Sequence, residues 1–473
     1  MRLRTTLLYA ALVAIGLGPW LLRPGTFLDG MTYASIARNM SAGIGTFWQP
    51  HYTSTVYPIF YEHPPLGLGI EYLFFSALGD GFYTEKIYGL VLTIGLLIAL
   101  RYIMSGVRLH AGILLLLSPL ALWMSSNVLL ELPLALAAIL SILSLDRALD
   151  LHRSPRTSPL YMVAAVALSL AAIYIKGPVA LFLLVAPSLI AWYHRRSMTS
   201  ILIAGLAHLL LLTSSFLVIM AALPEASAYW VNYLDQQVLS SIAGEREKSS
   251  ALTWIGVTAF NWCIPLGLSL VAAWWYHTRH RPRNVDGTKD IHQLTMEVPL
   301  SRSIQSHANK LKSTDPRLLH KPSRQATAFL LLALAATLPL LISPKIHMHY
   351  SYPGLILWMV ALSHYFSDSW KAVVSHVLSH RWYVQIAVGI ILIGLSLMLL
   401  RSGDSRKNDH RIDYAISAAD DLEDRTLCAA DALLSDWMLH ACLQRYARAS
   451  LRYAPPCEGE LIRDKLEGYK IRD

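Results

Sequence analysis

The chain alternates between long apolar runs and short polar or basic segments. A helix needs about 20 mostly apolar residues to cross the hydrocarbon core of a bilayer, and runs near this length recur through the first 400 residues. This pattern predicts an all-α polytopic membrane protein with about eleven transmembrane helices. Ten spans are expected at about 7–22, 86–104, 111–125, 130–146, 159–175, 200–222, 252–275, 326–342, 351–366 and 384–400. The remaining span is expected between the one at 159–175 and Arg195.

Basic residues set the expected orientation of these spans. Cytoplasmic loops are enriched in Lys and Arg, and the chain starts with the basic sequence MRLR. No small-residue cleavage site ends the first apolar run, so we expect an uncleaved span with its N-terminus in the cytoplasm. Residues 276–325 hold ten Lys or Arg against four Asp or Glu. This surplus predicts a cytoplasmic loop near anionic lipid.

Two other segments are expected on the outer side of the membrane. Residues 24–85 form a first external loop, in which the short apolar stretch 66–78 is expected to lie as a surface helix. Residues 401–473 form an extracytoplasmic tail with helical patterns at 420–434 and 437–453. Residues 1–400 are then the transmembrane domain.

The tail contains three of the four cysteines, Cys428, Cys442 and Cys457. An oxidising exterior permits one disulfide. We expect it between Cys442 and Cys457, because Pro455-Pro456 lets the chain turn back. The alternative is that all three are unpaired small hydrophobic side chains.

Composition excludes several classes of protein. Hydrophobic residues make up 54% of the chain and charged residues only 15%, whereas soluble proteins carry about 25% charged residues. A soluble enzyme and a disordered chain are therefore excluded. The net charge of +9 comes from basic residues between apolar runs. It indicates membrane topology, and no nucleic-acid partner is expected.

Polar and charged residues gather where the predicted spans meet the outer face. Such a set suits a reaction between a lipid phosphate and an external acceptor, because a leaving phosphate needs cationic partners. An acceptor hydroxyl or amine also needs a base within hydrogen-bond reach. The candidate site residues are Asp29, Arg38, Glu62, His63, Glu131, Lys176, Lys345, His347, His349 and Tyr350.

Several of these residues lie in short motifs. In order they are Asp29-Gly30-x-x-Tyr33-Ala34-x-Ile36-Ala37-Arg38-Asn39, Glu62-His63-Pro64-Pro65-Leu66, Gly79-Asp80 and Lys176-Gly177-Pro178. This order resembles the GT-C membrane glycosyltransferases. Within them it is similar to the dolichyl-phosphate-mannose–protein mannosyltransferases and the lipid A aminoarabinose transferases. The resemblance is best over about residues 1–200 and does not cover the tail.

The resemblance implies a GT-C fold and inverting transfer of one hexose or pentose from a polyprenyl-phosphate carrier. The acceptor would be a protein, lipid A or another glycan, and membrane lipid surrounds the enzyme. It also implies a multi-pass protein of the bacterial cytoplasmic membrane with a periplasmic active site. No cofactor is assigned, and a divalent cation is left open with its ligands unassigned.

The resemblance also implies roles for individual residues. Asp29 would be the general base, and Glu62 would position the acceptor or sugar or contact a metal. His63 stands where the aminoarabinose branch usually has Lys, and Glu131 stands where many members have Asp. These departures leave the donor and the acceptor open.

Several residues are expected to contact the carrier phosphate or the sugar. Lys176 lies between two apolar runs, where a charge is costly and usually functional. His63 would also contact the phosphate, as would Arg38. Lys345, His347, His349 and Tyr350 would contact phosphate or sugar. Metal binding by His347 and His349 is less favoured, because an i, i+2 pair needs an extended backbone to point both side chains one way.

Structural explanations compete with each of these roles. Asp29 could cap the helix that follows, and Glu62 or His63 could be an ordinary loop residue. Lys176 could snorkel to lipid headgroups. Glu131, just before Pro133, could serve only the dipole of its helix.

Two other functions compete with the enzyme. A transporter or flippase of lipid-linked sugars is the main alternative, but such folds usually show internal repeats and polar groups near mid-membrane. The sequence shows neither. A scaffold protein whose working part is the tail is the second alternative, and the tail has no motif that supports it.

Overall fold

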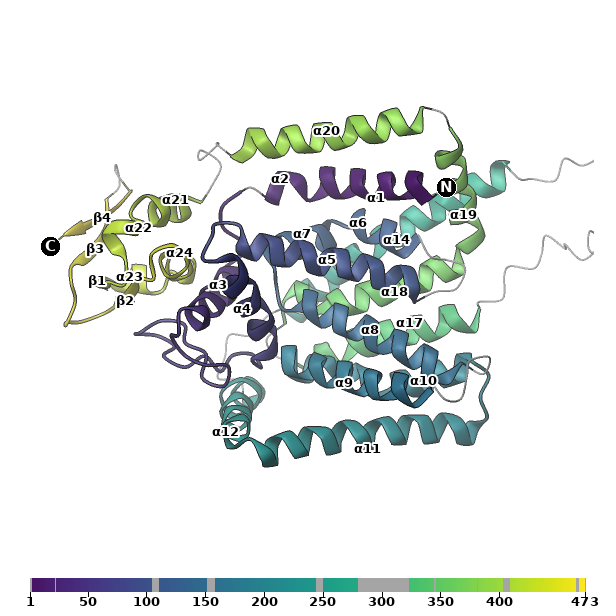
Figure 1. The fold of residues 1–473 in the computed structure, drawn as a ribbon, viewed down its shortest axis with the longest axis horizontal. Helices are drawn as coiled ribbons and strands as arrows, with labels where there is room; N and C mark the ends of the chain where they lie inside the picture. The colour runs from purple at the N-terminus through teal and green to yellow at the C-terminus, as the bar shows by residue number, and fades with distance from the viewer. Residues whose placement is uncertain are drawn as a thin grey trace, which may run out of the picture.

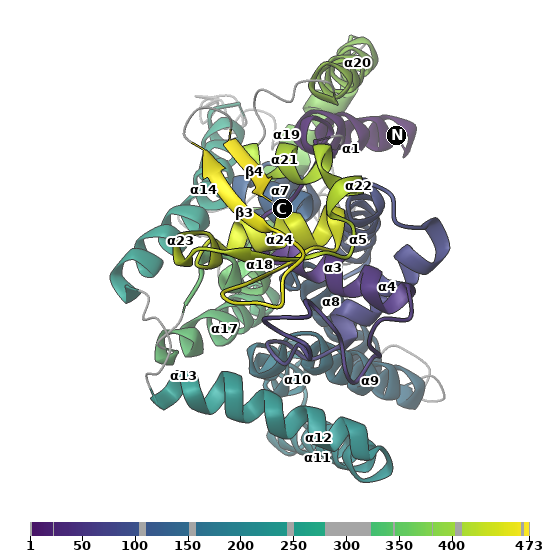
Figure 2. The same cartoon turned by 90° about the vertical axis from the view of Figure 1, so that its left-hand side faces the viewer.

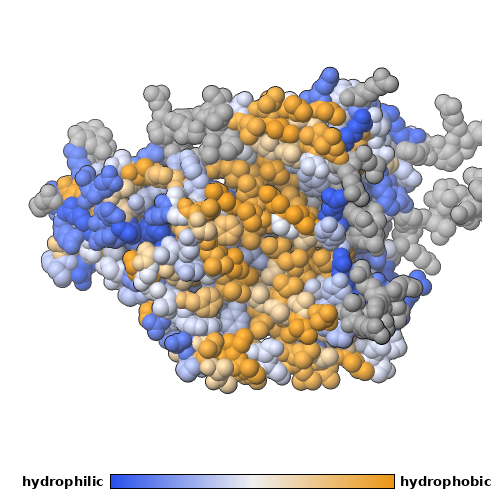
Figure 3. All heavy atoms as spheres, viewed as in Figure 1, coloured by the Kyte–Doolittle hydropathy of each residue, from blue (hydrophilic) through white to orange (hydrophobic). Residues whose placement is uncertain are grey.

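The computed structural model describes residues 2–21, 23–103, 110–150, 158–243, 250–279, 323–343, 346–380, 382–402, 409–464 and 468–472. Most of the predicted cytoplasmic loop at 276–325 lies outside these ranges, and so does Lys345. The described helices of the membrane domain run roughly parallel in one bundle (Figure 1). Figure 3 shows a broad apolar band across this bundle and a mostly hydrophilic tail beside it.

A helical segment occupies each predicted span. The segments are α1 Arg2–Gly16, α2 Gly18–Leu21, α5 Thr84–Tyr102, α6 His110–Leu116, α7 Pro119–Asn127, α8 Glu131–Leu149, α9 Ser158–Lys176, η1 Gly177–Leu184, α10 Ala186–Tyr193, α11 Met198–Ala222, α14 Ala251–Arg279, α17 Arg324–Thr337, η3 Leu338–Ile342, η4 Met348–Ser351, α18 Tyr352–Tyr365 and α20 Tyr383–Ser402. A further helix, α19 Ser367–Ser379, lies between the last two predicted spans. Among the described residues, five helices are long and apolar enough to cross a membrane, or six if the bent pair α19–α20 is one span. The total of eleven spans stays a prediction.

One helix break, at a glycine and a proline, shapes the site. Helix α9 ends at Lys176, and the chain continues as the 3-10 segment η1 from Gly177. Gly177 has φ +63°, a left-handed conformation that glycine adopts without a Cβ clash. Pro178 then lacks the amide hydrogen that would continue the helix. The break leaves Lys176 at a helix end.

Small residues bring neighbouring helices of the bundle together. Ser141 of α8 donates to the carbonyl of Ala165 in α9 at 3.0 Å, and its hydroxyl lies 2.8 Å from that of Ser169. Hydrogen bonds between small residues of adjacent helices are a common way of packing helices in membranes. Helix α11 differs, because it buries only Ala204, His208 and Leu212 and exposes an otherwise apolar surface.

The segments that the sequence predicts to be external gather at one end of the bundle, which we call the external end (Figure 1). They are α3 Leu28–Ser41, α4 Leu66–Leu78, α12 Pro224–Tyr233, the π-helical segment η2 Leu234–Leu239 and α13 Ser240–Ala243. The first residues of the chain and α19 lie at the opposite end. Figure 2 looks onto the external end and shows the tail lying over α3 and the ends of the membrane helices.

The tail is not the helical segment that the sequence predicts. It contains α21 His410–Ser417, α22 Ala419–Leu422, β1 Thr426–Ala429, α23 Asp431–Leu434, α24 Trp437–Ala447, β2 Ser450–Arg452, β3 Glu460–Asp464 and β4 Gly468–Arg472. The strands form one sheet in the order β2-β1-β3-β4. Strand β1 is parallel to β2 and β3, whereas β3 and β4 are antiparallel.

Two left-handed residues explain the wrong helix predictions. Asp424 has φ +59° and Arg448 has φ +52°, a conformation that ends a helix. The first predicted helix is therefore interrupted before β1, and α24 ends at Ala447 instead of continuing to Tyr453. The helical periodicity of the sequence does not reveal such breaks, because an Asp or Arg residue does not by itself mark the end of a helix.

The predicted disulfide is also wrong. The bond joins Cys428 and Cys457, whose Cα atoms lie 5.5 Å apart. Cys442 is free, because α24 turns it into the hydrophobic core of the tail. Gly459 follows Cys457 by two residues. Its carbonyl accepts a hydrogen bond from the amide of Cys428 at 2.8 Å. This backbone contact brings the two disulfide partners together.

Candidate active site

A buried ion pair joins the external ends of α8 and α9. The ammonium of Lys176 lies 3.0 Å from Oε1 of Glu131, and these side chains are only 3% and 0% exposed. Glu131 is in the first turn of α8 and Lys176 is in the last turn of α9. The dipole of each helix therefore favours the charge that it carries. Lys176 does not snorkel to the surface.

His349 connects this pair to Asp29. Its Nε2 lies 3.8 Å from Oε1 of Glu131 and 3.9 Å from Oδ2 of Asp29. These separations are too long for direct hydrogen bonds, so the three groups form a loose polar chain. Burial lowers the pKa of His349 to about 4, although Glu131 raises it. His349 is therefore neutral near pH 7.

Asp29 is the accessible carboxylate of this group. It lies in the first turn of α3, whose N-cap residue is Phe27. Asp29 therefore does not hold the capping position that the structural alternative assigned to it. Its side chain is 34% exposed, whereas that of Glu131 is fully buried. A base must reach the proton that it takes, and this geometry suits Asp29 better than Glu131.

Two tyrosine hydroxyls line the same region. Tyr33 follows Asp29 by one helical turn on α3, and burial together with Asp29 and Glu131 raises its pKa well above the ordinary value. The same causes raise the pKa of Tyr350, whose ring centroid lies 5.2 Å from the ammonium of Lys176. Both phenols are therefore protonated hydrogen-bond donors. Tyr33 was not predicted as a site residue, although its i, i+4 spacing from Asp29 is a usable signal.

Glu62 and His63 approach the site from the first external loop. The Tyr57 hydroxyl donates to Oε1 of Glu62 at 3.3 Å, and the His63 ring packs edge-on against Tyr33 at 5.7 Å between ring centroids. Tyr229 of α12 donates to the carbonyls of Phe60 and His63. The loop is thus tied to a helix far away in the sequence.

A second tyrosine of α12 reaches the break after α9. A Cβ atom added at Gly177 would meet the Tyr233 hydroxyl at 2.3 Å. Only glycine lets the phenol approach the backbone this closely. No sequence signal connects Tyr229 or Tyr233 with the site, because both contacts depend on how α12 folds back over the bundle.

Not every predicted residue joins the site. Arg38 is buried elsewhere, where it donates to Oδ1 of Asn39 at 2.8 Å and to the carbonyl of Arg445 at 3.1 Å. Burial lowers the pKa of Arg38 to about 10, although Asp80 raises it. His347 lies next to the site, because its ring stacks on that of His349 with 5.3 Å between the ring centroids. Lys345 lies outside the described residues.

The described residues of the site do not form a metal centre. Within the described ranges, no three His, Cys, Asp or Glu side chains are grouped closely enough to hold a metal ion. Among the residues that the structure describes, Oε2 of Glu131 is buried without a hydrogen-bond partner, and no such set of ligands surrounds it. The divalent cation that the sequence left open stays a prediction.

The helical bundle with its external loops has the GT-C fold of membrane glycosyltransferases. No family model and no curated protein sequence matches the chain. Solved structures do match it. ArnT from Cupriavidus metallidurans bound to undecaprenyl phosphate aligns with a TM-score of 0.58 at 14% identity, over 95% of this chain and 85% of that one.

Two further structures support the same conclusion about the fold. ArnT from Cupriavidus metallidurans in the apo state aligns with a TM-score of 0.56 at 15% identity, over 94% of this chain and 86% of that one. The Archaeoglobus fulgidus oligosaccharyltransferase in the apo form aligns with a TM-score of 0.50 at 13% identity, over 95% and 64% of the two chains. At these identities the likeness establishes the fold and not the substrates.

Proposed function

We propose that this protein transfers a single sugar, a hexose or a pentose, from a polyprenyl-phosphate carrier to an external acceptor with inversion. One observation carries the proposal. A partly exposed Asp29 stands beside the buried Lys176–Glu131 pair at the external end of the bundle. The fold is shared with ArnT, which was solved bound to undecaprenyl phosphate.

In the proposed reaction, Asp29 takes the proton of the acceptor nucleophile. The nucleophile attacks the anomeric carbon on the face opposite the phosphate, and the bond from that carbon to the phosphate oxygen breaks. The carrier phosphate leaves as an anion and takes no proton. Asp29 suits this role because its carboxylate is accessible and lies at the start of α3, where the helix dipole favours the anion.

Lys176 and Tyr350 are placed to stabilise the leaving phosphate. The ammonium of Lys176 lies over the Tyr350 ring and pairs with Glu131. An arriving phosphate would share that ammonium with Glu131, and fixed donors in a buried site stabilise developing charge strongly. The hydroxyls of Tyr33 and Tyr350 and neutral His349 add hydrogen-bond donors. From the loop, His63 would contact the phosphate, and Glu62 would position the sugar or the acceptor.

We also propose that the site faces the periplasm of a bacterial cell, across the cytoplasmic membrane. The tail lies at the site's end of the bundle, and it carries the Cys428–Cys457 disulfide. Disulfides persist in the periplasm and are rare in the cytosol. The acceptor is a protein, lipid A or another glycan.

The proposal is tested with membranes from cells that carry or lack this protein. Mass spectrometry of envelope glycans, lipids and glycoproteins should reveal a sugar that depends on the protein. Release of polyprenyl phosphate is then followed in the isolated membranes. Asp29→Asn should lower turnover by about 10²-fold or more while donor binding remains.

Asp368→Asn is the matched control, because Asp368 is an exposed residue that pairs with Lys371 and belongs to α19, the helix at the opposite end of the bundle in Figure 1. It should leave turnover unchanged. Normal transfer by Asp29→Asn would reject the assigned role of Asp29. Movement of the lipid-linked sugar across liposome membranes without transfer would instead favour the flippase.

A further inference from the structure

Helix α7 leads directly to one carboxylate of the candidate site and contacts the segment that carries the other. Its last residue is Asn127, and Val128 follows with φ +54°, a left-handed conformation that ends a helix. Helix α8 then starts at Glu131, four residues after Asn127. The other carboxylate, Asp29, belongs to α3, which is far away in the chain and reaches α7 only through the fold.

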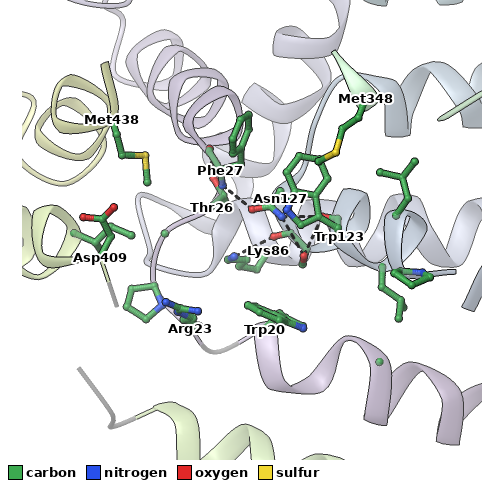
Figure 4. A pocket seen from close by; sticks show the side chains of 18 of the residues that line it. Trp20, Arg23, Thr26, Phe27, Lys86, Trp123, Asn127, Met348, Asp409 and Met438 are labelled. Atoms are coloured by element: carbon green, nitrogen blue, oxygen red, sulfur yellow. Dashed lines mark hydrogen bonds between the residues drawn. The ribbon is translucent and has the colours of Figure 1, made fainter. Parts of the chain in front are cut away.

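Asn127 contacts the start of α3. Its Oδ1 accepts a hydrogen bond from the amide of Phe27 at 2.6 Å, as Figure 4 shows. Phe27 is the N-cap residue of α3, and its side chain makes no capping hydrogen bond. The first amides of a helix have no acceptor within the helix. Asn127 therefore supplies from another helix an acceptor at the end of α3 where Asp29 lies in the first turn.

The Asn127 side chain is itself held in place. Its Nδ2 donates to the carbonyl of Trp123 at 2.9 Å and lies 3.3 Å from the Ser126 hydroxyl oxygen, to which it also donates. The amide oxygen and the amide nitrogen thus both have partners. A side chain fixed at both of its polar atoms can determine where the amide of Phe27 lies.

Gly30 lets α3 approach this helix end closely. A Cβ atom added at Gly30 would lie 2.1 Å from the carbonyl oxygen of Asn127, so a larger residue would force α3 to move. Ring contacts act on the same turn, because the Phe27 ring centroid lies 5.3 Å from that of Trp123 and 6.4 Å from that of His349. A hydrogen bond, a close backbone contact and two ring contacts therefore fix the first turn of α3.

Lys86 of α5 holds the same end of α7. It is only 5% exposed, and its ammonium donates to the carbonyl of Ser126 at 3.1 Å (Figure 4). The last carbonyls of a helix have no partner within it, and the helix dipole favours a cation at that end. Lys86 therefore stabilises the turn of α7 from which the Asn127 side chain reaches α3.

We propose that Asn127 positions Asp29 for proton transfer, and that Lys86 supports it through the end of α7. Both are positioning residues, since they act through Asp29 and take no proton themselves. The inference rests on the proposed function, in which Asp29 is the general base. A base works only within hydrogen-bond reach of the proton that it takes, and a displacement of about 1 Å can lower a rate by about 10²-fold.

The first test separates turnover from binding. Asn127→Leu removes the acceptor of the Phe27 amide at similar side-chain size, and it should lower the release of polyprenyl phosphate in isolated membranes by about 10- to 10²-fold. Binding of undecaprenyl phosphate to the purified full-length protein, measured by native mass spectrometry, should be unchanged, because the Lys176 contacts are intact. Asn232→Leu is the matched control, since the Asn232 amide donates to the carbonyl of Ala228 in its own helix, and its turnover should be normal.

The second test asks whether Asn127 acts through Asp29. Asn127→Leu should lower turnover in the wild type but lower the residual turnover of Asp29→Asn little further, because residues that act as a unit are not additive. Equal factors in the two backgrounds would overturn the inference, since a general loss of folded protein lowers both alike. Loss of undecaprenyl phosphate binding in Asn127→Leu would also overturn it.

Two further variants approach the same contact from its other partners, and they keep the test decisive if Asn127→Leu does not fold. Gly30→Ala should displace α3 and lower turnover, whereas Gly256→Ala should not, because a Cβ atom there meets nothing within 4 Å. Lys86→Met should lower turnover by a smaller factor, with the exposed Lys371→Met as its control. Normal turnover in Gly30→Ala would contradict the inference.

Hydrogen exchange distinguishes this inference from the proposed function. In the purified protein, amides of residues 27–33 should exchange faster in Asn127→Leu than in the wild type, while those of α19 should exchange equally. Unchanged exchange at residues 27–33 would overturn the inference even if turnover fell. Faster exchange there, with no sugar transfer by the wild type, would overturn the proposed function and with it the role of Asp29 that Asn127 serves.

Discussion

The ammonium of Lys176 and Oε1 of Glu131 lie 3.0 Å apart in a place where neither side chain is more than 3% exposed. Taking two charges out of water is costly, and an apolar pair in such a place is often as stable or more stable. The pair is therefore better explained by a function than by stability. The pair lies beside Tyr350 and His349. We propose that its function is to hold the Lys176 ammonium in place for a phosphate group.

Breaking this pair should destabilise the protein. Glu131→Gln leaves a buried ammonium unpaired, and Lys176→Met leaves a buried carboxylate unpaired, which costs about 3–5 kcal/mol in such cases. Thermal unfolding in detergent should show a lower midpoint for each variant. The double variant Glu131→Gln/Lys176→Met should regain most of the stability and none of the transferase activity. An inactive double variant with single variants of normal stability would contradict this account.

Stability should depend on pH through His349. Burial, opposed in part by Glu131, lowers the pKa of His349 to about 4, whereas a histidine in the unfolded chain has a pKa of about 6.5. Between these values the unfolded chain binds more protons, so stability rises with pH. This contribution is complete above about pH 6.5 and is lost as the pH falls towards 4.

The measurement is the melting midpoint at several pH values across this window. His349→Asn cannot take up the proton and should show a shallower slope than the wild type. His376→Gln is the control, because it removes an exposed histidine of α19, the helix at the other end of the bundle in Figure 1. Equal slopes for the wild type and His349→Asn would refute this explanation.

Arg445 should hold the tail on the membrane domain. Its guanidinium is 3% exposed and lies 2.8 Å from Asp80 and 2.9 Å from Glu85. Arg445→Met leaves buried Glu85 without its cation, and about 3–5 kcal/mol of stability should be lost. The tail should then become sensitive to protease, and Arg445→Lys should restore part of the protection.

Arg448, the residue that ends the helix of Arg445, provides a matched control. It pairs with Glu423 and Asp424, whose side chains are 61% and 62% exposed. Surface pairs contribute about 0–1 kcal/mol, so Arg448→Met should change protease sensitivity little. Equal effects of the two substitutions would show that the tail is not anchored through Arg445.

The disulfide should be identifiable without a structure. Peptide mapping under non-reducing conditions should recover Cys428 linked to Cys457. Cys428→Ser should lower the stability of the tail by about 2–4 kcal/mol, the usual contribution of such a cross-link. Cys263→Ser, which removes an exposed free cysteine, should leave the cross-link in place. Recovery of a Cys442–Cys457 peptide would contradict the structure.

The positions of the membrane helices could be predicted well from the sequence. Apolar runs indicate helices because a backbone in lipid must satisfy its own hydrogen bonds. Lys176 could be singled out for the same reason, since a charge between two apolar runs is rarely accidental. The tail could not be predicted this way, because its strands are short and its helix ends depend on left-handed Asp424 and Arg448.

The grouping of the site was predicted only in part. The sequence selected Asp29, Glu131, Lys176, His349 and Tyr350, which the structure brings together. It also selected Arg38, which the structure places with Asn39 and the tail. Tyr33, Tyr229 and Lys86 were not selected. An aromatic or basic residue near a membrane surface has many ordinary explanations, so its type alone does not single it out.

The sequence by itself determined that the chain crosses a membrane, where its helices lie and which residues are chemically suited to its external end. These properties depend on local hydrophobicity and residue type, which the order of amino acids records directly. The tertiary structure decided that Lys176 meets Glu131, that Arg38 meets the tail and that Cys428 meets Cys457. Such contacts join residues far apart in the chain, and they depend on how helices pack and where the chain turns.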